Sequence, residues 1–202
     1  MWNQKFNRQD YLYGTEPNDF LRSAAEQLSP NSKVLCIAEG EGRNAIFLAK
    51  LGHQVTAMDA SEVGLNKAKQ LAKKNGVSLK TLVADLADFE MGVSRWDAVI
   101  AIFCHLPPSL RKLVNQKIVT ALKPNGLFIA EAYSKKQIEH DTGGPKDLNL
   151  LMDLNQVKSE LTGLDWLLAS EIKREIIEGA GHTGLGEAIQ LIGIKPNTKP
   201  LR

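Results

Sequence analysis

A glycine-rich segment flanked by carboxylates, residues 39–42, follows a short apolar run and precedes a segment with helical periodicity. Gly40 and Gly42 allow the backbone to approach a ligand closely, and the free N–H groups at the start of the helix favour an anionic group there. Asp59 ends the next apolar run, 19 residues after Gly40. At this spacing a carboxylate can bind the two hydroxyls of a ribose. Together, the loop and the acid predict a nucleotide-type ligand.

The charge of the loop distinguishes between two such ligands. The string Gly40-x-Gly42-x-x-Ala45 also fits the fingerprint of NAD-binding proteins. A pyrophosphate would lie beside Glu39 and Glu41, and each carboxylate at about 4 Å would cost roughly 1 kcal/mol in water, or about 4 kcal/mol at an effective dielectric constant near 20. S-adenosylmethionine carries an ammonium and a sulfonium, which these carboxylates favour. We therefore expect S-adenosylmethionine as the cofactor, with an NAD-linked oxidoreductase as an alternative.

Asp85 and Leu86 follow the third apolar run, at the carboxyl edge of the predicted sheet, where ligands of open α/β sheets bind. The carboxylate of Asp85 could accept a hydrogen bond from an adenine amino group, and Leu86 could offer its backbone N–H and an apolar face. The alternative is that Asp85 only caps the next turn.

Three polar residues follow the next two apolar runs and are candidates for the substrate pocket: His105, Glu131 and Tyr133. His105 could also accept a proton from a substrate, and Tyr133 is a second candidate for a catalytic residue. Alternatively, His105 caps the helix that starts at Pro107-Pro108, and the other two are ordinary polar residues where a strand leads into a loop. No obligatory catalytic group is expected for transfer from a sulfonium, because alignment and proximity can supply most of the rate.

The elements that must position these residues alternate between apolar runs and helical periodicity from about residue 33 to residue 132. Continuous apolar runs are typical of parallel strands that are covered on both faces. The predicted strands are 34–38, 55–58, 81–84, 98–103 and 126–130, and the predicted core-facing helices lie between them.

The flanking segments have different patterns. Before the core, a helix is predicted over 17–28 with Pro17 in its first turn, after a segment that carries Tyr11 and Tyr13. After the core, the polar segment 134–146 is expected to be a mobile loop, either a lid over bound substrate or a plain connection. A helix over 148–161 and two long strands, 166–177 and 187–194, follow, and the glycine-rich segment 179–186 is expected to be the turn between these strands.

Length and composition indicate one domain, residues 1–202, of ordinary globular type. The 25 basic and 23 acidic residues are interspersed and give a net charge of +2, so no nucleic-acid-binding surface is expected. Cys36 and Cys104 lie in apolar runs and are expected to be buried, reduced thiols. No signal peptide and no apolar stretch of membrane-spanning length is recognised, so we expect a cytoplasmic protein. We also expect a monomer. The histidines lack metal-ligand spacing, and no serine-hydrolase or phosphate-loop motif occurs.

The segments Val34-Leu35-Cys36-Ile37-Ala38-Glu39-Gly40-Glu41-Gly42-Arg43-Asn44, Val55–Asp59, Ala84-Asp85, Trp96–Ile100 and Leu122–Leu127 resemble class I S-adenosylmethionine-dependent methyltransferases. The likeness is greatest to the small tellurite-resistance and thiopurine (thiol) methyltransferase-like group. It implies a Rossmann-like α/β fold with a mostly parallel seven-stranded sheet, an antiparallel last strand and helices on both faces. In this arrangement residues 1–30 cover the cofactor, 31–133 bind it, and 134–202 supply the lid loop, a helix and a β-hairpin.

The resemblance also implies a cofactor site. The glycine loop would hold the methionine part, Asp59 the ribose, and Asp85 with Leu86 the adenine, while the backbone near Ala101 and Ile102 would lie below the sulfonium. The implied cofactor-binding residues are Tyr11, Tyr13, Ala38, Glu39, Gly40, Gly42, Asp59, Ala60, Asp85, Leu86, Ala101 and Ile102.

Two positions depart from the family pattern, which usually has an acid at Cys36 and a glycine at Ala38. We hypothesise that Glu39 supplies the missing charge. The expected activity is methyl transfer to a small-molecule acceptor, such as a thiol, a metalloid or another small nucleophile, and the sequence does not identify which. The alternative, which the two departures leave open, is a protein that binds S-adenosylmethionine without catalysis.

Overall fold

The computed structural model describes residues 1–197 and contains a seven-stranded mixed sheet. The strand order is β3-β2-β1-β4-β5-β7-β6, and β7 runs antiparallel to both of its neighbours while the other strand pairs are parallel. This confirms the predicted Rossmann-like fold. The strands are β1 (Lys33–Ile37), β2 (Gln54–Asp59), β3 (Lys80–Val83), β4 (Trp96–Ile102), β5 (Leu122–Tyr133), β6 (Asp165–Glu178) and β7 (His182–Ile194).

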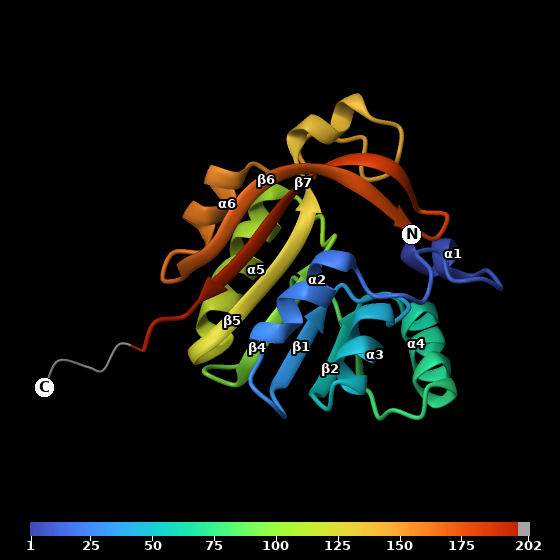
Figure 1. Cartoon of the computed structure of the whole chain (residues 1–202), viewed down its shortest axis with the longest axis horizontal. Helices are drawn as coiled ribbons and strands as arrows, with labels where there is room; N and C mark the ends of the chain where they lie inside the picture. Colours follow the sequence, from blue (N-terminus) through green and yellow to red (C-terminus); the bar gives the residue numbers. More distant parts are fainter. Residues whose placement is uncertain (198–202) are drawn as a thin grey trace, which may run out of the picture.

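Helices cover both faces of this sheet (Figure 1). Helices α2, α3 and α4 lie on one face, and α5 and α6 lie on the other. The helices are α1 (Trp2–Phe6), α2 (Asp19–Ala24), α3 (Arg43–Lys50), α4 (Glu62–Lys74), α5 (Pro108–Ala121) and α6 (Leu154–Glu160), with short 3₁₀ helices η1 (Ala25–Gln27) and η2 (Lys135–Glu139).

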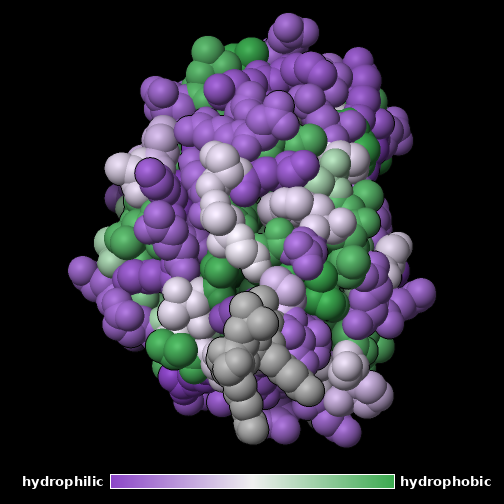
Figure 2. Space-filling view, turned by 90° about the vertical axis from the view of Figure 1, so that its left-hand side faces the viewer, coloured by the Kyte–Doolittle hydropathy of each residue, from purple (hydrophilic) through white to green (hydrophobic). Residues whose placement is uncertain are grey.

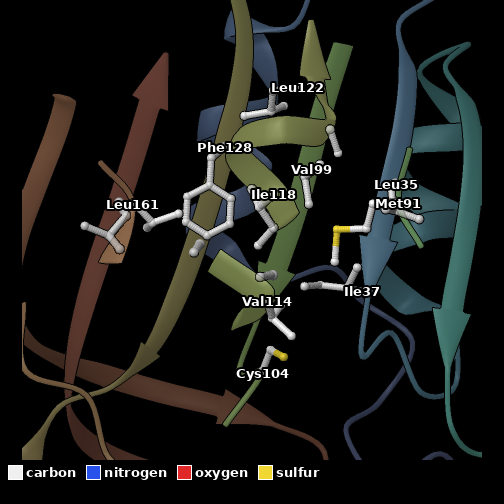
Figure 3. Packing of buried hydrophobic residues seen from close by; sticks show 14 of the residues in the cluster. Leu35, Ile37, Met91, Val99, Cys104, Val114, Ile118, Leu122, Phe128 and Leu161 are labelled. Atoms are coloured by element: carbon white, nitrogen blue, oxygen red, sulfur yellow. The ribbon is translucent and has the colours of Figure 1, made fainter. Parts of the chain in front are cut away.

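Alternation along the central strands divides the interior into two hydrophobic cores. In β1, Val34 and Cys36 pack toward α2 and α3, whereas Leu35 and Ile37 pack toward α5. Figure 3 shows the second of these cores, in which Phe128 lies among residues from several elements. Because both faces of the strands are buried, the strands must be apolar throughout, which is why the sequence pattern identified them.

The β6–β7 hairpin extends beyond the sheet. Pairing between β5 and β7 ends at Tyr133 and Ala188, whereas pairing between β6 and β7 continues to Glu178 and His182. The free end of the hairpin therefore passes over the carboxyl edge of the sheet and reaches the N-terminal segment (Figure 1). One of the glycines that suggested a turn over 179–186 lies inside a strand where packing is close: a Cβ at Gly186 would lie 2.8 Å from Cδ1 of Ile176 and 3.0 Å from the Tyr133 ring. The prediction of a turn was wrong for residues 182–186, which belong to β7.

Two helix predictions need correction, and one helix was missed. Pro17 precedes the helix, because Asn18 is its N-cap and accepts a hydrogen bond from the N–H of Leu21, and the segment ends as 3₁₀ helix. The predicted helix over 148–161 begins only at Leu154, since Asp153 caps it through the N–H of Gln156. Helix α1 was not predicted at all.

The segment 134–146 contains η2 and is fastened to the hairpin. Gln137 is buried, and its Oε1 accepts a hydrogen bond from the N–H of Glu187 at 2.8 Å. The hydroxyl of Thr142 donates to the carbonyl of Leu185 at 2.6 Å, and its carbonyl accepts from the N–H of Thr183 at 2.8 Å. In this structure the segment packs against the β6–β7 hairpin through these hydrogen bonds. That the segment opens as a lid stays a prediction.

Two further expectations concern cysteines and surface. Cys36 and Cys104 are buried free thiols, as predicted, and burial raises the pKa of the Cys104 thiol to about 12. Over residues 1–197 no helix combines the length and apolar character needed to cross a membrane. The face shown in Figure 2 is mostly hydrophilic, with hydrophobic residues in small groups.

Candidate functional site

The glycine loop turns sharply where β1 ends. Ala38, Gly40 and Gly42 have φ values of 50°, 62° and 93°, all in the left-handed region. Gly42 is the N-cap of α3, and a Cβ there would lie 2.5 Å from the Cβ of Ala68 in α4, so this close approach requires glycine. Ala38 is partly exposed and adopts a backbone conformation that costs a non-glycine residue about 1 kcal/mol or more. Strain of this kind is often kept at functional sites.

Asp59, at the end of β2, is bound to this loop. Its Oδ2 accepts a hydrogen bond from the N–H of Gly40 at 2.9 Å, and its Oδ1 accepts one from the N–H of Ser61 at 2.7 Å. The side chain is buried, and burial raises its pKa even though these backbone N–H groups act in the opposite direction. The two elements that the sequence paired are therefore in direct contact. Ala60 follows as an exposed residue.

Glu39 caps the helix that follows the loop. Its Oε1 accepts hydrogen bonds from the N–H groups of Asn44 and Ala45 at 3.0 and 2.8 Å. No donor from the described residues reaches its Oε2, and the residue is partly exposed. Burial raises the pKa of Glu39 to about 7. One oxygen of this carboxyl group is therefore available to a ligand at the loop.

Glu41 points elsewhere. Its Oε2 accepts a hydrogen bond from the N–H of Leu12 at 2.8 Å, and Oε1 forms an ion pair with Lys67 of α4. The Lys67 ammonium also donates to the carbonyls of Arg8 and Asp10 at 3.1 and 2.6 Å. Glu41 thus fastens the N-terminal segment, and its charge is compensated. Of the two loop carboxylates in the charge argument, only Glu39 stays available to act on a ligand.

The two N-terminal tyrosines lie in different places. The Tyr11 ring packs between α3 and α4 beside Ile46 and Leu71, with the Lys67 ammonium 4.8 Å from its centroid. Tyr13 instead lies at the free end of the hairpin, where its ring centroid is 4.7 Å from that of His182. The structure therefore brings Tyr13, and not Tyr11, together with the other candidates.

The carboxyl end of β4 carries a second left-handed residue. Phe103 has φ of 52°, is partly exposed, and donates its N–H to the carbonyl of Glu131 at 2.7 Å. Just before it, the side chains of Ala101 and Ile102 are buried in opposite cores, so only their backbone could form the floor of a site. Five rings gather around this point, from four parts of the chain: Tyr13, Phe103, His105, Tyr133 and His182.

His105 uses both ring nitrogens within the protein. Nδ1 lies 2.9 Å from the carbonyl oxygen of Leu150, and Nε2 lies 3.4 Å from the N–H of Tyr133, which donates to it. Burial lowers the pKa of His105 to about 4, so the ring is neutral at physiological pH. It does not cap α5, whose N-cap is Pro107 without a side-chain hydrogen bond. A role in proton transfer stays a prediction.

A buried polar network lies beside the rings. Glu131 is fully buried and accepts hydrogen bonds from Arg174 at 2.9 and 2.6 Å and from Gln190 at 2.7 Å. The amide of Asn18 donates to Glu131 at 2.6 Å and to Glu178 at 2.9 Å. Glu178 also accepts from Arg43 at 2.7 Å and pairs with His182 at 2.8 Å. Each carboxylate in this network therefore faces one guanidinium.

Sequence reasoning did not single out Asn18, Glu178 or His182. The signal for Asn18 was its position after a proline, as a helix N-cap. The other two lie at the facing ends of two long strands, a position that only the hairpin pairing reveals.

The adenine candidates lie at the far end of the edge. The N–H of Ala84 donates to the carbonyl of Asp59 at 3.0 Å, which places the end of β3 beside Asp59. Asp85 is exposed, and its Oδ1 accepts from the N–H of Ala87 at 2.9 Å, which is the capping role considered as its alternative. Leu86 is buried in the core. Binding of adenine by these residues stays a prediction.

The donor set suits S-adenosylmethionine. Glu39 and Asp59 present carboxyl groups at a glycine loop, which match an ammonium and a ribose diol. The strained, partly exposed residues Ala38 and Phe103 lie at the ends of adjacent strands, and this is the crevice in which open α/β sheets bind ligands.

Comparison with known proteins agrees with this geometry. Residues 34–126 match the family model described as a methyltransferase domain. Over 133 residues the chain is 29% identical to the 2-heptyl-1-hydroxyquinolin-4(1H)-one methyltransferase of Mycobacteroides abscessus, covering 64% of this chain and 59% of the relative. Over 84 residues it is 37% identical to the tRNA 5-carboxymethoxyuridine methyltransferase of Escherichia coli, covering 37% and 31%. The structure of a SAM-dependent methyltransferase from Methanosarcina mazei aligns with a TM-score of 0.70 at 16% identity, covering 86% of this chain and 97% of that one.

These matches show a likeness to methyltransferases that is centred on residues 34–126, and they leave the acceptor open. The chain spans less than two thirds of the length of either curated relative, and the names of the two relatives differ in the acceptor, a small molecule in one and tRNA in the other. The specific likeness to the tellurite-resistance and thiopurine group is not established by them. The family model and the relatives agree on one class: residues 34–126 match a methyltransferase domain, whose cofactor is S-adenosylmethionine, and the chain shares the Rossmann-like fold of the solved methyltransferase structure.

Proposed function

We propose that the protein transfers the methyl group of S-adenosylmethionine to a small-molecule acceptor that binds between the glycine loop and the free end of the β6–β7 hairpin. The observation that carries the proposal is the meeting, at one edge of the sheet, of the Asp59–Gly40 contact and the cluster of five rings. The first suits the adenosine part of the cofactor, and the second suits an acceptor.

The cofactor, when bound, supplies a methyl group on a positively charged sulfur. In our proposal Asp59 binds the ribose hydroxyls, and the free oxygen of Glu39 binds the methionine ammonium. Glu39 thereby replaces the acid that is absent at Cys36. The carbonyl of the strained residue Ala38 and the backbone of Ala101 and Ile102 surround the sulfonium. Electrostatic complementarity of this kind favours this cofactor over NAD.

A small acceptor is supported by the closure of the site. The N–H groups of Ala180 and Gly181 donate to the carbonyl of Leu12 at 2.9 and 3.1 Å, so the hairpin and the N-terminal segment form a continuous cover. A net charge of +2 also provides little attraction for a polynucleotide. Rings around the acceptor position suit a planar aromatic acceptor, a class to which the substrate named for the M. abscessus relative belongs.

Two measurements test the proposal. Calorimetry with S-adenosylhomocysteine should give a single site with micromolar or tighter affinity, and NAD should give no heat. Incubation with S-adenosylmethionine and a panel of small thiols and phenols should release S-adenosylhomocysteine. Absence of nucleoside binding would contradict the proposal, whereas binding without turnover over a wide acceptor panel would favour the non-catalytic alternative. We also propose that the protein is a cytoplasmic monomer. Sedimentation of the purified chain should therefore give the mass of one protomer.

A further inference from the structure

We propose that His182, oriented by Glu178, removes a proton from the acceptor, so that the acceptor is a protic nucleophile such as a thiol or a hydroxyl compound. The inference rests on the proposed function and deepens it. Its basis is a buried carboxylate–imidazole pair: Oε2 of Glu178 lies 2.8 Å from Nδ1 of His182, and the two side chains are 6% and 5% exposed.

The surroundings of Glu178 fix which nitrogen of the imidazole carries hydrogen. Burial by itself would raise the pKa of Glu178, but the hydrogen bond from His182 and the charge of Arg43 lower it to about 2. Glu178 is therefore a carboxylate, which can only accept hydrogen bonds. It must receive the Nδ1 hydrogen of His182, and in the neutral ring this leaves the lone pair on Nε2, where no partner is found among residues 1–197.

The charges beside the imidazole are paired. Glu131 pairs with Arg174 and Glu178 pairs with Arg43, and the Arg43 guanidinium shares Oε2 of Glu178 with the imidazole. The other titratable groups that face the ring are Tyr13 from the N-terminal segment, Tyr133 from β5 and the neutral His105 after β4. These three groups carry no positive charge, and the Glu178 carboxylate, which lies between Arg43 and the imidazole, would stabilise the transient imidazolium.

A second polar group points to the same place. The Tyr133 hydroxyl is fully buried and has no hydrogen-bond partner in the described part of the chain. A Cβ on Gly143 would lie 2.9 Å from this hydroxyl and 2.8 Å from Cδ2 of His182, the carbon next to Nε2. An orphaned buried hydroxyl is costly, and an acceptor oxygen or sulfur between the two groups would satisfy it. Gly143 packs against both the Tyr133 hydroxyl and the His182 ring, so the segment 134–146 must move away to admit the acceptor.

The step is balanced without a further reactant. The lone pair of the acceptor oxygen or sulfur attacks the methyl carbon of S-adenosylmethionine, and the electrons of the breaking S–C bond return to sulfur, giving S-adenosylhomocysteine. The acceptor proton passes to Nε2 of His182, and the imidazolium releases it to water after the methylated product leaves. Nucleophiles that carry no proton, such as iodide, would gain nothing from this base.

The first test needs no variant. The chain has four histidines, so ¹⁵N-detected NMR can resolve each ring. His182 should be neutral at pH 7.5 with hydrogen on Nδ1 and none on Nε2. A ring protonated on Nε2 at this pH, or doubly protonated up to pH 9, would overturn the proposal, and this result does not depend on any acceptor.

The second test measures release of S-adenosylhomocysteine with four acceptors. Thiophenol and 4-nitrothiophenol are largely ionised at pH 8, whereas 2-mercaptoethanol and phenol hold their proton. His182→Gln keeps a donor for Glu178 and should lower the rate about 100-fold or more with the two protonated acceptors, but less than about tenfold with 4-nitrothiophenol. His53→Gln, at the opposite edge of the sheet, is the matched control and should leave all four rates unchanged.

The outcomes separate the two proposals. An equal loss with all four acceptors would assign His182 a purely structural role. Cofactor binding by the unmodified protein without turnover of any of the four would overturn the proposed acceptor class, while the cofactor assignment would stand. Absence of cofactor binding would remove the proposed function itself.

Discussion

The carboxylate of Asp59 accepts a hydrogen bond from the backbone N–H of Gly40 at 2.9 Å, and this contact joins the ends of β1 and β2. Its other oxygen accepts from the N–H of Ser61. Asp59 therefore holds the glycine loop and the start of α4 in one geometry. In our proposal it also binds the ribose, so one side chain shapes the site and contacts the ligand.

Asp59→Asn should weaken binding of S-adenosylhomocysteine by about 10–100-fold, since a hydrogen bond to a charged acceptor contributes about 1.5–3 kcal/mol. Stability should also fall by about 1–3 kcal/mol, because the amide NH₂ must face the N–H of either Gly40 or Ser61 as donor against donor. Calorimetry and urea denaturation measure the two effects. Asp88→Asn, in an exposed turn, should change neither, and unchanged affinity in Asp59→Asn would contradict the ribose assignment.

How far the sequence could predict this site depends on how local each feature is. The glycine loop and Asp59 were predictable because apolar strands alternate with helices, and the carboxyl ends of parallel strands share an edge. The sequence could not predict that Glu39 stays at the loop while Glu41 turns away from it, because the partner of Glu41 is Lys67 in another helix. His182 was missed because its partners Tyr13, Phe103 and Tyr133 are far from it in the chain. Contacts of that kind arise only from tertiary packing.

Glu39 should make stability fall as the pH rises from about 4.5 to 7. Its folded-state pKa is raised from 4.5 to about 7 by burial, so in this window the folded protein binds more protons than the unfolded chain. Glu39→Gln keeps an acceptor for the N–H groups of Asn44 and Ala45 but does not titrate. The free energy of unfolding of the variant, relative to the parent, should therefore increase from pH 5 to pH 8 in urea titrations. A constant difference across this range would contradict the raised pKa.

The same carboxyl group should link cofactor binding to pH. An ammonium beside Oε2 favours the ionised form, so binding of S-adenosylhomocysteine near pH 7 should release a proton. Calorimetry in two buffers of different ionisation enthalpy measures this release, and Glu39→Gln should abolish it. If the variant binds the cofactor within twofold of the parent, Glu39 does not replace the acid absent at Cys36.

Ala38→Gly should stabilise the protein by up to about 1 kcal/mol. Ala38 has φ of 50°, and glycine removes a left-handed strain of roughly 1–2 kcal/mol, which exceeds its additional backbone entropy in the unfolded chain. Ala87→Gly, in an exposed turn without a left-handed φ, is the matched control and should destabilise or have no effect. Thermal melting of both variants decides the matter, and equal destabilisation would mean that no strain is stored at Ala38.

Lys67→Met should release the N-terminal segment from the glycine loop. The ammonium of Lys67 pairs with the buried Glu41 and holds the carbonyls of Arg8 and Asp10, so its removal leaves a buried carboxylate without its cation, at a cost of roughly 3 kcal/mol. Hydrogen exchange should then increase over residues 5–14, and the cofactor should dissociate faster if this segment covers it. The double variant Lys67→Met/Glu41→Gln should recover part of the stability, because the uncompensated charge is gone. Lys69→Met, two residues further along α4 and exposed, should behave like the parent. The same exchange pattern in both single variants would show that the segment is held by other contacts.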